Sequence, residues 1–387
     1  MDNSQVRVGI IGVGNCARAL IEGTAFYRAH PDVTAGLMFP LIGPYAAGSV
    51  EPVAAWDVDT EKVGKDLWSA RAAGQNLHVG IPQDELLPVA ADVEVLRAPT
   101  LDGAGNRYQE RIGLAPEEPG QDRAEVVEQI RAAGVDVLLS YLPVGSQAAS
   151  EWWAETALEA GVAFVNNIPA FIASEGPWRE RFRAAGLPLI GDDIKSQLGA
   201  TYVHRALVRA FADRGVALQR TYQLNVGGNM DFYNMLEQER LASKRRSKTS
   251  AVTDAYTGEL SDDSVHIGPS DYVPFLGDTK KAFIRCEGLG FGGAPIELEV
   301  QLTVPDSPNS AGVVIDAARI AKLAMDRGDV AVDEWVSAWL FKAPPRAVAQ
   351  ESDLVAKDQL RRWIRDGSSR DGSSRDGLSR EGSSGGA

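Results

Sequence analysis

A glycine-containing turn near the start of the chain constrains the fold most strongly. Residues 6–11, VRVGII, form a short apolar run typical of a buried strand, and a helix-forming stretch begins at Ala17. Between them, residues 12–17 (GVGNCA) match the dinucleotide-binding pattern G-x-G-x-x-A. In that pattern Gly12 permits the tight turn, Gly14 lets a pyrophosphate approach the backbone, and Ala17 allows close helix packing. An ordinary strand-to-helix turn is the alternative, which the segments that follow disfavour.

An acidic residue ends the next apolar run. Residues 53–56, VAAW, predict a strand, and Asp57 follows directly. A carboxylate at this position accepts hydrogen bonds from the adenosine ribose and favours NAD over NADP. The separation from Ala17 is 57 − 17 = 40 residues rather than about 20. We therefore interpret residues 30–50 as an insertion, and Asp57 could instead be only a helix cap.

Polar loops follow three further predicted strands. Residues 135–139 (VDVLL) lead into Ser140–Ser146, a second strand ends at Asn166-Asn167, and a third ends at residues 191–196, GDDIKS. Helical stretches separate these strands, which is the alternation of a doubly wound parallel sheet. Such a sheet binds ligands at the carboxyl ends of its strands.

The pattern changes after about residue 215. Residues 296–304, IELEVQLTV, alternate apolar and polar side chains, and 218–226 and 281–287 are further strand candidates. We expect a largely antiparallel α+β domain here, after which a helix at 311–327 rejoins the first domain. The predicted fold is therefore α/β, a Rossmann-like doubly wound parallel sheet with an inserted α+β catalytic and oligomerisation domain. The expected domains are 1–200 and 306–364 for nucleotide binding, 201–305 for the insertion, and 365–387 for a disordered Gly/Ser/Arg/Asp-rich tail.

Composition excludes several classes of protein. The formal net charge of −14 argues against nucleic acid or an anionic membrane as partner. The two cysteines exclude a disulfide scaffold and fit a reducing cytoplasm, and the four histidines show no metal-ligand spacing. No apolar stretch approaches the ~20 residues of a membrane span. We therefore expect a cytoplasmic protein.

Lysines gather in the predicted second domain. Lys244 and Lys248 lie four apart in SKRRSKT, Lys280 follows Gly277-Asp278-Thr279, and Lys342 stands in LFKAP. They could be solvated charges, or a buried cluster that binds phosphate and has depressed lysine pKa values suited to proton transfer. Residues 225–231 and 306–311 could likewise be polar site residues or only turns and helix caps.

Ten segments together resemble the myo-inositol-1-phosphate synthase family, particularly its short actinobacterial members. In chain order they are VGNCA (13–17), AWDVD (55–59), PTLDG (99–103), LLSYLPVGS (138–146), GDDIKSQLGAT (191–201), LNVGGNMDF (224–232), SKRRSKT (243–249), HIGPSD (266–271), DSPNSAG (306–312) and FKAP (341–344). They cover nearly everything except the tail. One departure is residues 197–201, which are less glycine-rich than in longer members.

The resemblance implies an NAD-dependent isomerase that converts glucose 6-phosphate to inositol 1-phosphate without net redox change. Oxidation at C5, enolisation, intramolecular aldol attack on C1 and reduction would follow one another. The alternatives are a related sugar-phosphate cyclase or a plain dehydrogenase, and an idle NAD-binding protein, which the four lysines disfavour.

The family's functional residues carry over by motif. Lys280, Lys244 and Lys342 would be the cationic, proton-transferring set, with Lys280 serving the C5 oxygen, and Asp193, Asn225 and Asp231 would orient lysines and hydroxyls. The implied phosphate ligands are Ser196, Gln197, Lys248 and Asn229. The implied cofactor-binding residues are Gly12, Val13, Gly14, Asn15, Cys16, Asp57, Ser140, Pro143, Asp192, Lys195, Asp306 and Ser307. A monovalent or divalent cation near the cofactor phosphates and a homotetramer built through the second domain's sheet are also implied.

Overall fold

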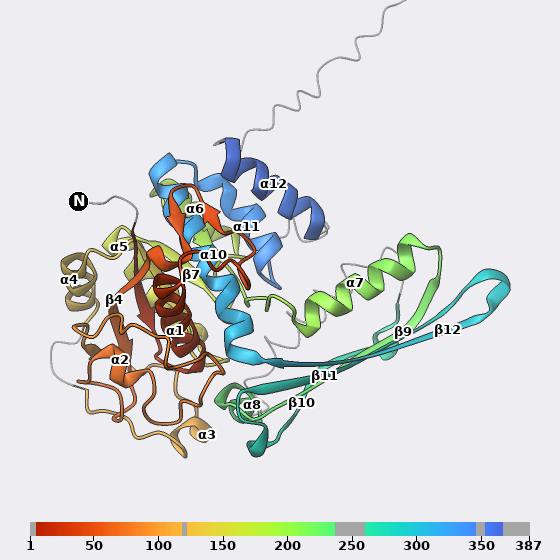
Figure 1. The fold of residues 1–387 in the computed structure, drawn as a ribbon, viewed down its shortest axis with the longest axis horizontal. Helices are drawn as coiled ribbons and strands as arrows, with labels where there is room; N and C mark the ends of the chain where they lie inside the picture. Colours follow the sequence, from red (N-terminus) through yellow and green to blue (C-terminus); the bar gives the residue numbers. More distant parts are fainter. Residues whose placement is uncertain (1–4, 118–121, 237–259, 346–352, 367–387) are drawn as a thin grey trace, which may run out of the picture.

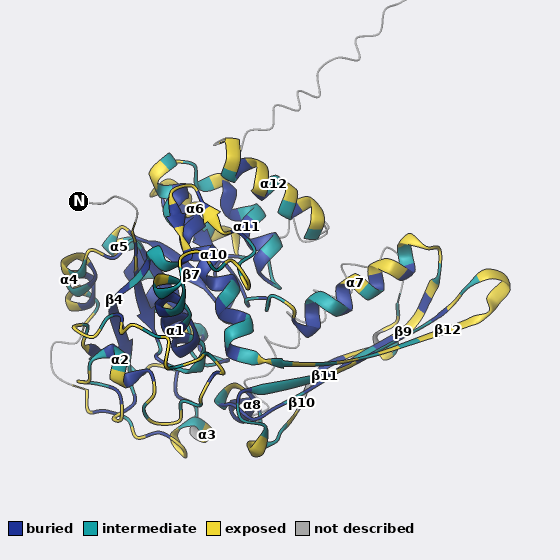
Figure 2. Ribbon diagram, in the orientation of Figure 1, coloured by how far each residue is buried: buried dark blue, intermediate teal, exposed yellow. Residues whose placement is uncertain are grey.

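The computed structural model describes residues 5–117, 122–236, 260–345 and 353–366, which form two units (Figure 1). In the first unit, helices cover both faces of a six-stranded sheet. The second unit is a long sheet that extends away from the first, with one helix running along it. Figure 2 shows that buried residues concentrate in the first unit, whereas the far end of the long sheet is exposed.

Parallel strands build the first sheet in the order β5-β4-β1-β6-β7-β8. Their bounds are β1 Val6–Ile11, β4 Val50–Asp57, β5 Val95–Arg97, β6 Val137–Ser140, β7 Ala163–Asn166 and β8 Leu189–Ile190. Most of their residues are buried, as expected for parallel strands covered on both faces. The order changes direction between β1 and β6, which places a crevice at their carboxyl ends.

Helices α1 and α10 pack against each other on one face of this sheet, and α4 and α5 pack on the other. The larger helices of the unit are α1 Asn15–Ala29, α4 Arg123–Ala133, α5 Gln147–Ala160, α6 Gly176–Ala184, α10 Asp306–Arg327, α11 Asp333–Leu340 and α12 Asp353–Asp366. Shorter ones are α2 Leu67–Ala70 and α3 Asn106–Gln109. The interpreted insertion at 30–50 carries a small hairpin, β2 Leu41–Ile42 with β3 Tyr45–Ala46.

The second sheet has the order β10-β9-β11-β12. Its strands are β9 Ala217–Gly227, β10 Val265–Tyr272, β11 Thr279–Leu289 and β12 Pro295–Pro305. The three strands predicted from sequence, β9, β11 and β12, are antiparallel neighbours, whereas β10 was missed and pairs parallel with β9. Helix α7 Ala200–Asp213 packs its apolar side on alternate residues of β11, among them Ile284 and Cys286.

Helix α10 follows β12 without a loop and returns to the first unit, where it contacts α1 and β7. The predicted doubly wound sheet with an inserted second sheet is therefore confirmed. None of the helices in the described ranges is long and apolar enough to cross a membrane.

Candidate active site between the two units

A pocket lies at the carboxyl ends of the first sheet's strands. Its lining includes Asp57 at the end of β4, Gly14 after β1, Pro143 after β6, Asn167 after β7 and Asp193 after β8. The second unit closes it. Of the predicted residues the lining contains Gly14, Asn15, Cys16, Asp57, Pro143, Asp193, Ser196, Asn225, Asn229, Asp231, Lys280, Asp306, Ser307 and Lys342.

The glycine turn leaves the start of α1 open to this pocket. Gly12 has φ +88°, and a Cβ there would lie 2.9 Å from the Tyr141 carbonyl oxygen, so only glycine fits. A Cβ at Gly14 would meet nothing within 4 Å. Helix α1 has neither a side-chain cap nor an acidic residue in its first turn. Its free N–H groups and positive dipole end are therefore available to an anion such as a pyrophosphate.

A second helix also begins at the pocket. The N-cap of α7, Gly199, has no capping side chain, and the first turn contains no acidic residue. Gly199, Ala200 and Thr201 all line the pocket. Two uncapped helix N-termini, from α1 and α7, thus open into one pocket, which suits a ligand set with two separate phosphate groups.

Asp57 organises the glycine turn. Its Oδ2 accepts a hydrogen bond from the Val13 backbone N–H at 2.7 Å, and its Oδ1 accepts from Val58 and Asp59 at 2.7 and 2.9 Å. Lys62, which sequence reasoning missed, lies 3.8 Å from Asp57 Oδ2 and also lines the pocket. The carboxylate is therefore not a helix cap, and it stands where the pattern places a ribose ligand.

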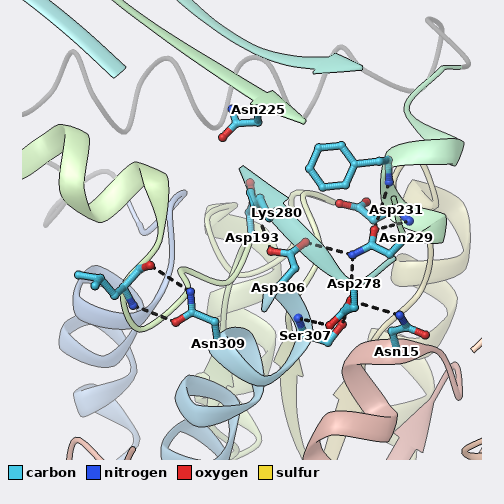
Figure 3. A network of polar contacts seen from close by, with 12 residues as sticks. Asn15, Asp193, Asn225, Asn229, Asp231, Asp278, Lys280, Asp306, Ser307 and Asn309 are labelled. Atoms are coloured by element: carbon cyan, nitrogen blue, oxygen red, sulfur yellow. Dashed lines mark hydrogen bonds and ion pairs between the residues drawn. The ribbon is translucent and has the colours of Figure 1, made fainter. Parts of the chain in front are cut away.

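Lys280 and Asp306 form an ion pair at the reaction end of the pocket (Figure 3). The Lys280 Nζ donates to Asp306 Oδ1 at 3.2 Å and lies 5.7 Å from the centre of the Phe232 ring. Burial opposes the charge, but Asp306, then Asp231 and Asp193, outweigh it and raise the lysine's pKa. The expectation of a depressed lysine pKa is thus wrong for Lys280.

Lys342 lines the same pocket. Its Nζ donates to Asp193 Oδ1 at 2.6 Å, and its backbone N–H donates to the Asp193 carbonyl at 2.8 Å. Asp193 has a positive φ of 60° and is buried. The pocket therefore brings together lysines 62 residues apart in the sequence (342 − 280), one from β11 and one from the loop after α11.

Several buried polar atoms around the pocket have no hydrogen-bond partner among the described residues. They are both side-chain amide atoms of Asn167, Oδ1 of Asn234, Oγ of Ser310 and the Tyr141 hydroxyl. Buried polar groups are normally paired. Their concentration around one pocket indicates a polar ligand, and sequence reasoning had singled out none of these four residues as a ligand.

Asn225 and Asn229 are engaged within the protein. The Asn225 amide donates to the Gly268 carbonyl at 2.8 Å, and Asn229 Oδ1 caps α8 (Met230–Asn234) by accepting from Asp231 and Phe232. Such bonds hold the pocket wall in shape, and they leave less of the Asn229 side chain for a phosphate than the sequence suggested.

Other predicted residues lie elsewhere. The Asp192 carboxylate accepts from Asn166 and from the backbone of residues 172–174, and Ser140 is fully buried. The Lys195 Nζ donates to the Ala338 carbonyl and to Asp353. Gln197 lines a second, more apolar pocket beside α10. None of these four side chains lines the main pocket.

Three further predictions complete the set. Gly12 and Val13 act through the turn rather than as lining residues. Lys244 and Lys248 lie outside the described residues. Burial, followed by Asp306 and Asp278, raises the pKa of the Cys16 thiol to about 12, so the thiol stays protonated at neutral pH.

The doubly wound sheet, the open glycine turn and the lysine-containing second unit together define an enzyme of the dinucleotide-dependent class. A family model described as myo-inositol-1-phosphate synthase matches residues 199–307. The chain is 50% identical to the inositol-3-phosphate synthase of Mycolicibacterium smegmatis over 366 residues, covering 93% of this chain and 98% of that protein. It is also 50% identical to that of Corynebacterium glutamicum over 371 residues, covering 94% and 99%.

A solved structure shares the fold. The crystal structure of a myo-inositol-1-phosphate synthase-related protein from Thermotoga maritima superposes with a TM-score of 0.77 at 24% identity, covering 93% of this chain and 98% of that one. The chain belongs to the myo-inositol-1-phosphate synthase family. The family resemblance drawn from the sequence is thereby confirmed.

Proposed function

We propose that the chain converts D-glucose 6-phosphate to 1L-myo-inositol 1-phosphate, the reaction of an inositol-3-phosphate synthase. The observation that carries the proposal is the meeting of two lysine–aspartate pairs, Lys280–Asp306 and Lys342–Asp193, in a pocket that also holds the open start of α1. The identity to inositol-3-phosphate synthases over nearly the whole chain supports it.

The residues present fit NAD. When bound, NAD⁺ would accept hydride from C5 of the open-chain sugar and later return it to the same carbon. Gly14 and the N–H groups of α1 would hold its pyrophosphate, and Asp57 would accept from the ribose. The unpartnered Asn167 amide and the Ser310 hydroxyl are further polar groups that a bound cofactor could satisfy.

Lys280 is the residue we assign to the C5 oxygen. Asp306 keeps it an ammonium, the form that returns a proton to that oxygen and stabilises negative charge on it. Oxidation instead requires Lys280 to take a proton. Its pKa would fall once a positively charged nicotinamide ring lies beside it, because like charges disfavour the ammonium.

The two ammonium groups serve the carbon–carbon step. Enolisation transfers a proton from C6 to a basic group and places negative charge on the C5 oxygen. Aldol attack on C1 then moves that charge to the C1 oxygen, which takes up a proton. Lys280 and Lys342, partly buried and held by carboxylates, are preorganised to stabilise both oxyanions. The pocket also holds both ends of one molecule together, which supplies the entropic advantage of an intramolecular reaction.

We assign the substrate phosphate to the start of α7 with Ser196. The uncapped α7 N-terminus attracts a dianion, and Ser196 lines the pocket beside it. Lys248, outside the described residues, stays a predicted ligand. A cation near the cofactor phosphates stays a prediction from the resemblance, since the described residues contain no cluster of three His, Cys, Asp or Glu that would mark its site.

We further propose a homotetramer that forms through the second sheet. Large apolar side chains are exposed on its long arm, with Phe283 39%, Ile296 39% and Phe291 101% exposed (Figure 2). A second copy of the chain would cover them. Sedimentation velocity at micromolar concentration should give the tetramer mass, and a monomer mass would contradict the proposal.

The central experiment incubates purified protein with glucose 6-phosphate and a catalytic amount of NAD⁺, and follows products by phosphorus and proton NMR. We expect a cyclitol phosphate to accumulate while NADH absorbance stays flat. NADH rising in step with substrate loss would instead identify a plain dehydrogenase. The absence of any cyclitol phosphate would overturn the proposal.

A further inference from the structure

Asp278 lies behind the pocket, between the two units. It precedes β11 in the second unit, two residues before Lys280, and it is only 7% exposed. Its side chain does not line the pocket, and the sequence patterns gave it no role. Figure 3 shows it at the centre of the polar network, with neighbours from α1, from the cap of α8 and from the start of α10.

The Asp278 carboxylate accepts hydrogen bonds from three separate segments. Its Oδ1 accepts from Asn15 Nδ2 at 3.2 Å, from Asn229 Nδ2 at 3.1 Å and from Ser307 Oγ at 2.7 Å. Its Oδ2 accepts from the Ser307 N–H at 3.0 Å. All three donor residues line the pocket, so one buried acid fixes three points of its wall.

The same network reaches the ion pair at the reaction end. The Asn229 Nδ2 is shared with Asp306 Oδ2 at 3.2 Å, and Asp306 holds Lys280. The Asp306 N–H also donates to the Asp278 carbonyl at 2.8 Å. Burial, and then Asp306, raise the pKa of Asp278, because the carboxylate loses water and lies beside a like charge.

We propose that Asp278 is a positioning residue that holds the Lys280–Asp306 pair of the second unit in register with the glycine turn of the first. The proposal rests on the proposed function. In that reaction a hydride leaves C5 while a proton leaves the oxygen on the same carbon. The first unit would hold the group that receives the hydride, and the second unit holds Lys280, so an error of about 1 Å between them would cost about 100-fold in rate.

The test compares Asp278→Ala and Asp278→Asn with the wild-type chain. We expect Asp278→Ala to lower kcat by about 100-fold and Asp278→Asn by a smaller factor, since the amide keeps one acceptor but turns a donor toward the Ser307 N–H. The KM for glucose 6-phosphate should change by less than about threefold, because the phosphate site does not touch Asp278. Unchanged kcat in Asp278→Ala would overturn the proposal.

Asp353→Asn is the matched control. Asp353 is a partly buried acid that also joins separate segments, accepting from Lys195 at 2.7 Å and Arg205 at 3.1 Å, but it does not line the pocket. Asp353→Asn and the Asp278 variants should all have a lower thermal midpoint than the wild type. Only the Asp278 variants should also have a lower kcat per folded molecule. Equal loss of kcat in Asp353→Asn would reduce Asp278 to a stability role and overturn the proposal.

A binding measurement without substrate tests the role of Asp278 independently of the proposed reaction. The double-mutant cycle of Asn15→Ala and Asp278→Asn is measured on the Kd of NAD⁺ by fluorescence titration, without substrate. Because the two side chains share a hydrogen bond, we expect their effects to be non-additive by at least about threefold. Additive effects would overturn the coupling even if cyclisation is seen, whereas a wild-type chain that binds NAD⁺ but forms no cyclitol overturns only the proposed function.

Discussion

Two lysine–aspartate pairs lie near each other in the first unit, and only one of them lines the pocket. At the reaction end, Lys342 pairs with Asp193 inside the pocket. Two residues along the chain from Asp193, Lys195 points the other way and pairs with Asp353 of α12. The first pair faces a ligand site, whereas the second does not line that pocket.

The pKa values of Lys195, which is outside the pocket, and Lys280, which is inside it, shift in opposite directions. Burial lowers the pKa of Lys195 to about 8, because the pull of Asp353 is weaker than the loss of water and Arg205 adds a like charge. Lys280 is partly buried, yet three carboxylates raise its pKa. A buried lysine with a depressed pKa is therefore no guide to the reaction centre here. The surplus of carboxylates is the more informative feature.

The largest expected effect is at Lys280. Lys280→Ala should lower the rate of cyclisation by about 1,000-fold, within the usual range for loss of a proton-transferring group. The affinity for NAD⁺ should change by less than about fivefold, since α1 and Asp57 are untouched. Product formation by NMR and NAD⁺ titration check the two expectations. Turnover near the wild-type rate would remove Lys280 from the chemistry.

Lys195→Met should remove the Lys195–Asp353 ion pair and lower stability rather than the rate of reaction. Asp353 and Arg205 would lose a buried partner, which typically costs about 3 kcal/mol of unfolding free energy. We expect a thermal midpoint lower by roughly 5–10 °C, with NAD⁺ affinity and kcat per folded molecule close to those of the wild type. A marked loss of NAD⁺ affinity would instead support the cofactor role that the sequence suggested for Lys195.

A third buried cluster, in the second unit, holds a base without a charged partner. His204 lies between α7 and β9 beside Thr221 and Gln223, and burial lowers its pKa to about 4, although the Gln223 hydrogen bond opposes this. The unfolded chain, with an ordinary value near 6.5, then binds more protons between pH 6.5 and 4. The free energy of unfolding should therefore decrease as the pH is lowered from 6.5 to 4.

The His204 contribution is bounded by the size of that shift. A change of about 2.5 pKa units corresponds to a loss of up to ~3 kcal/mol on going from pH 7 to pH 4. Chemical denaturation at pH 7, 5 and 4 measures it, and His204→Asn provides the comparison. The variant should lose less stability on acidification than the wild type. Identical pH profiles would show that His204 titrates normally.

The smallest expected effect is at Cys16, which lines the pocket but whose thiol takes no part in the proposed reaction. A pKa of about 12 against an ordinary 9.0 lowers the thiolate fraction at pH 8 by about 1,000-fold. Iodoacetamide should therefore modify Cys16 very slowly, as followed by mass spectrometry. Cys16→Ser should keep kcat within about twofold. Rapid alkylation would mean that the surrounding carboxylates do not act on the thiol as described.

The parts of the site that the sequence predicted well are local in the chain. The glycine turn needs only a strand, two glycines, and a helix in succession, so residues 6–17 suffice to define it. Asp57 follows its strand directly. Lys280 and Asp306 were assigned through the family motifs, and each stands near the start of a regular element, Lys280 in β11 and Asp306 in α10. The missed strand β10 has a weak pattern of its own and depends on its parallel neighbour β9.

The parts that it did not predict depend on contacts between distant segments. Lys195 is bound by residues 143 and 158 positions away. Asp278 acquires its role through Asn15, 263 positions away. A polar side chain in such a loop can face either the pocket or the helices behind the loop. Which of the two it faces depends on how those helices pack.

The amino-acid order by itself determined the doubly wound sheet, the glycine turn and the family, because hydrophobic periodicity and short motifs act along the chain. Only the tertiary structure decided which buried charges face the pocket and which clamp helices together. The physical reason is that a buried charge needs a partner within a few ångströms, and for Lys195, Asp278 and Lys342 the chain supplies that partner only after it has folded.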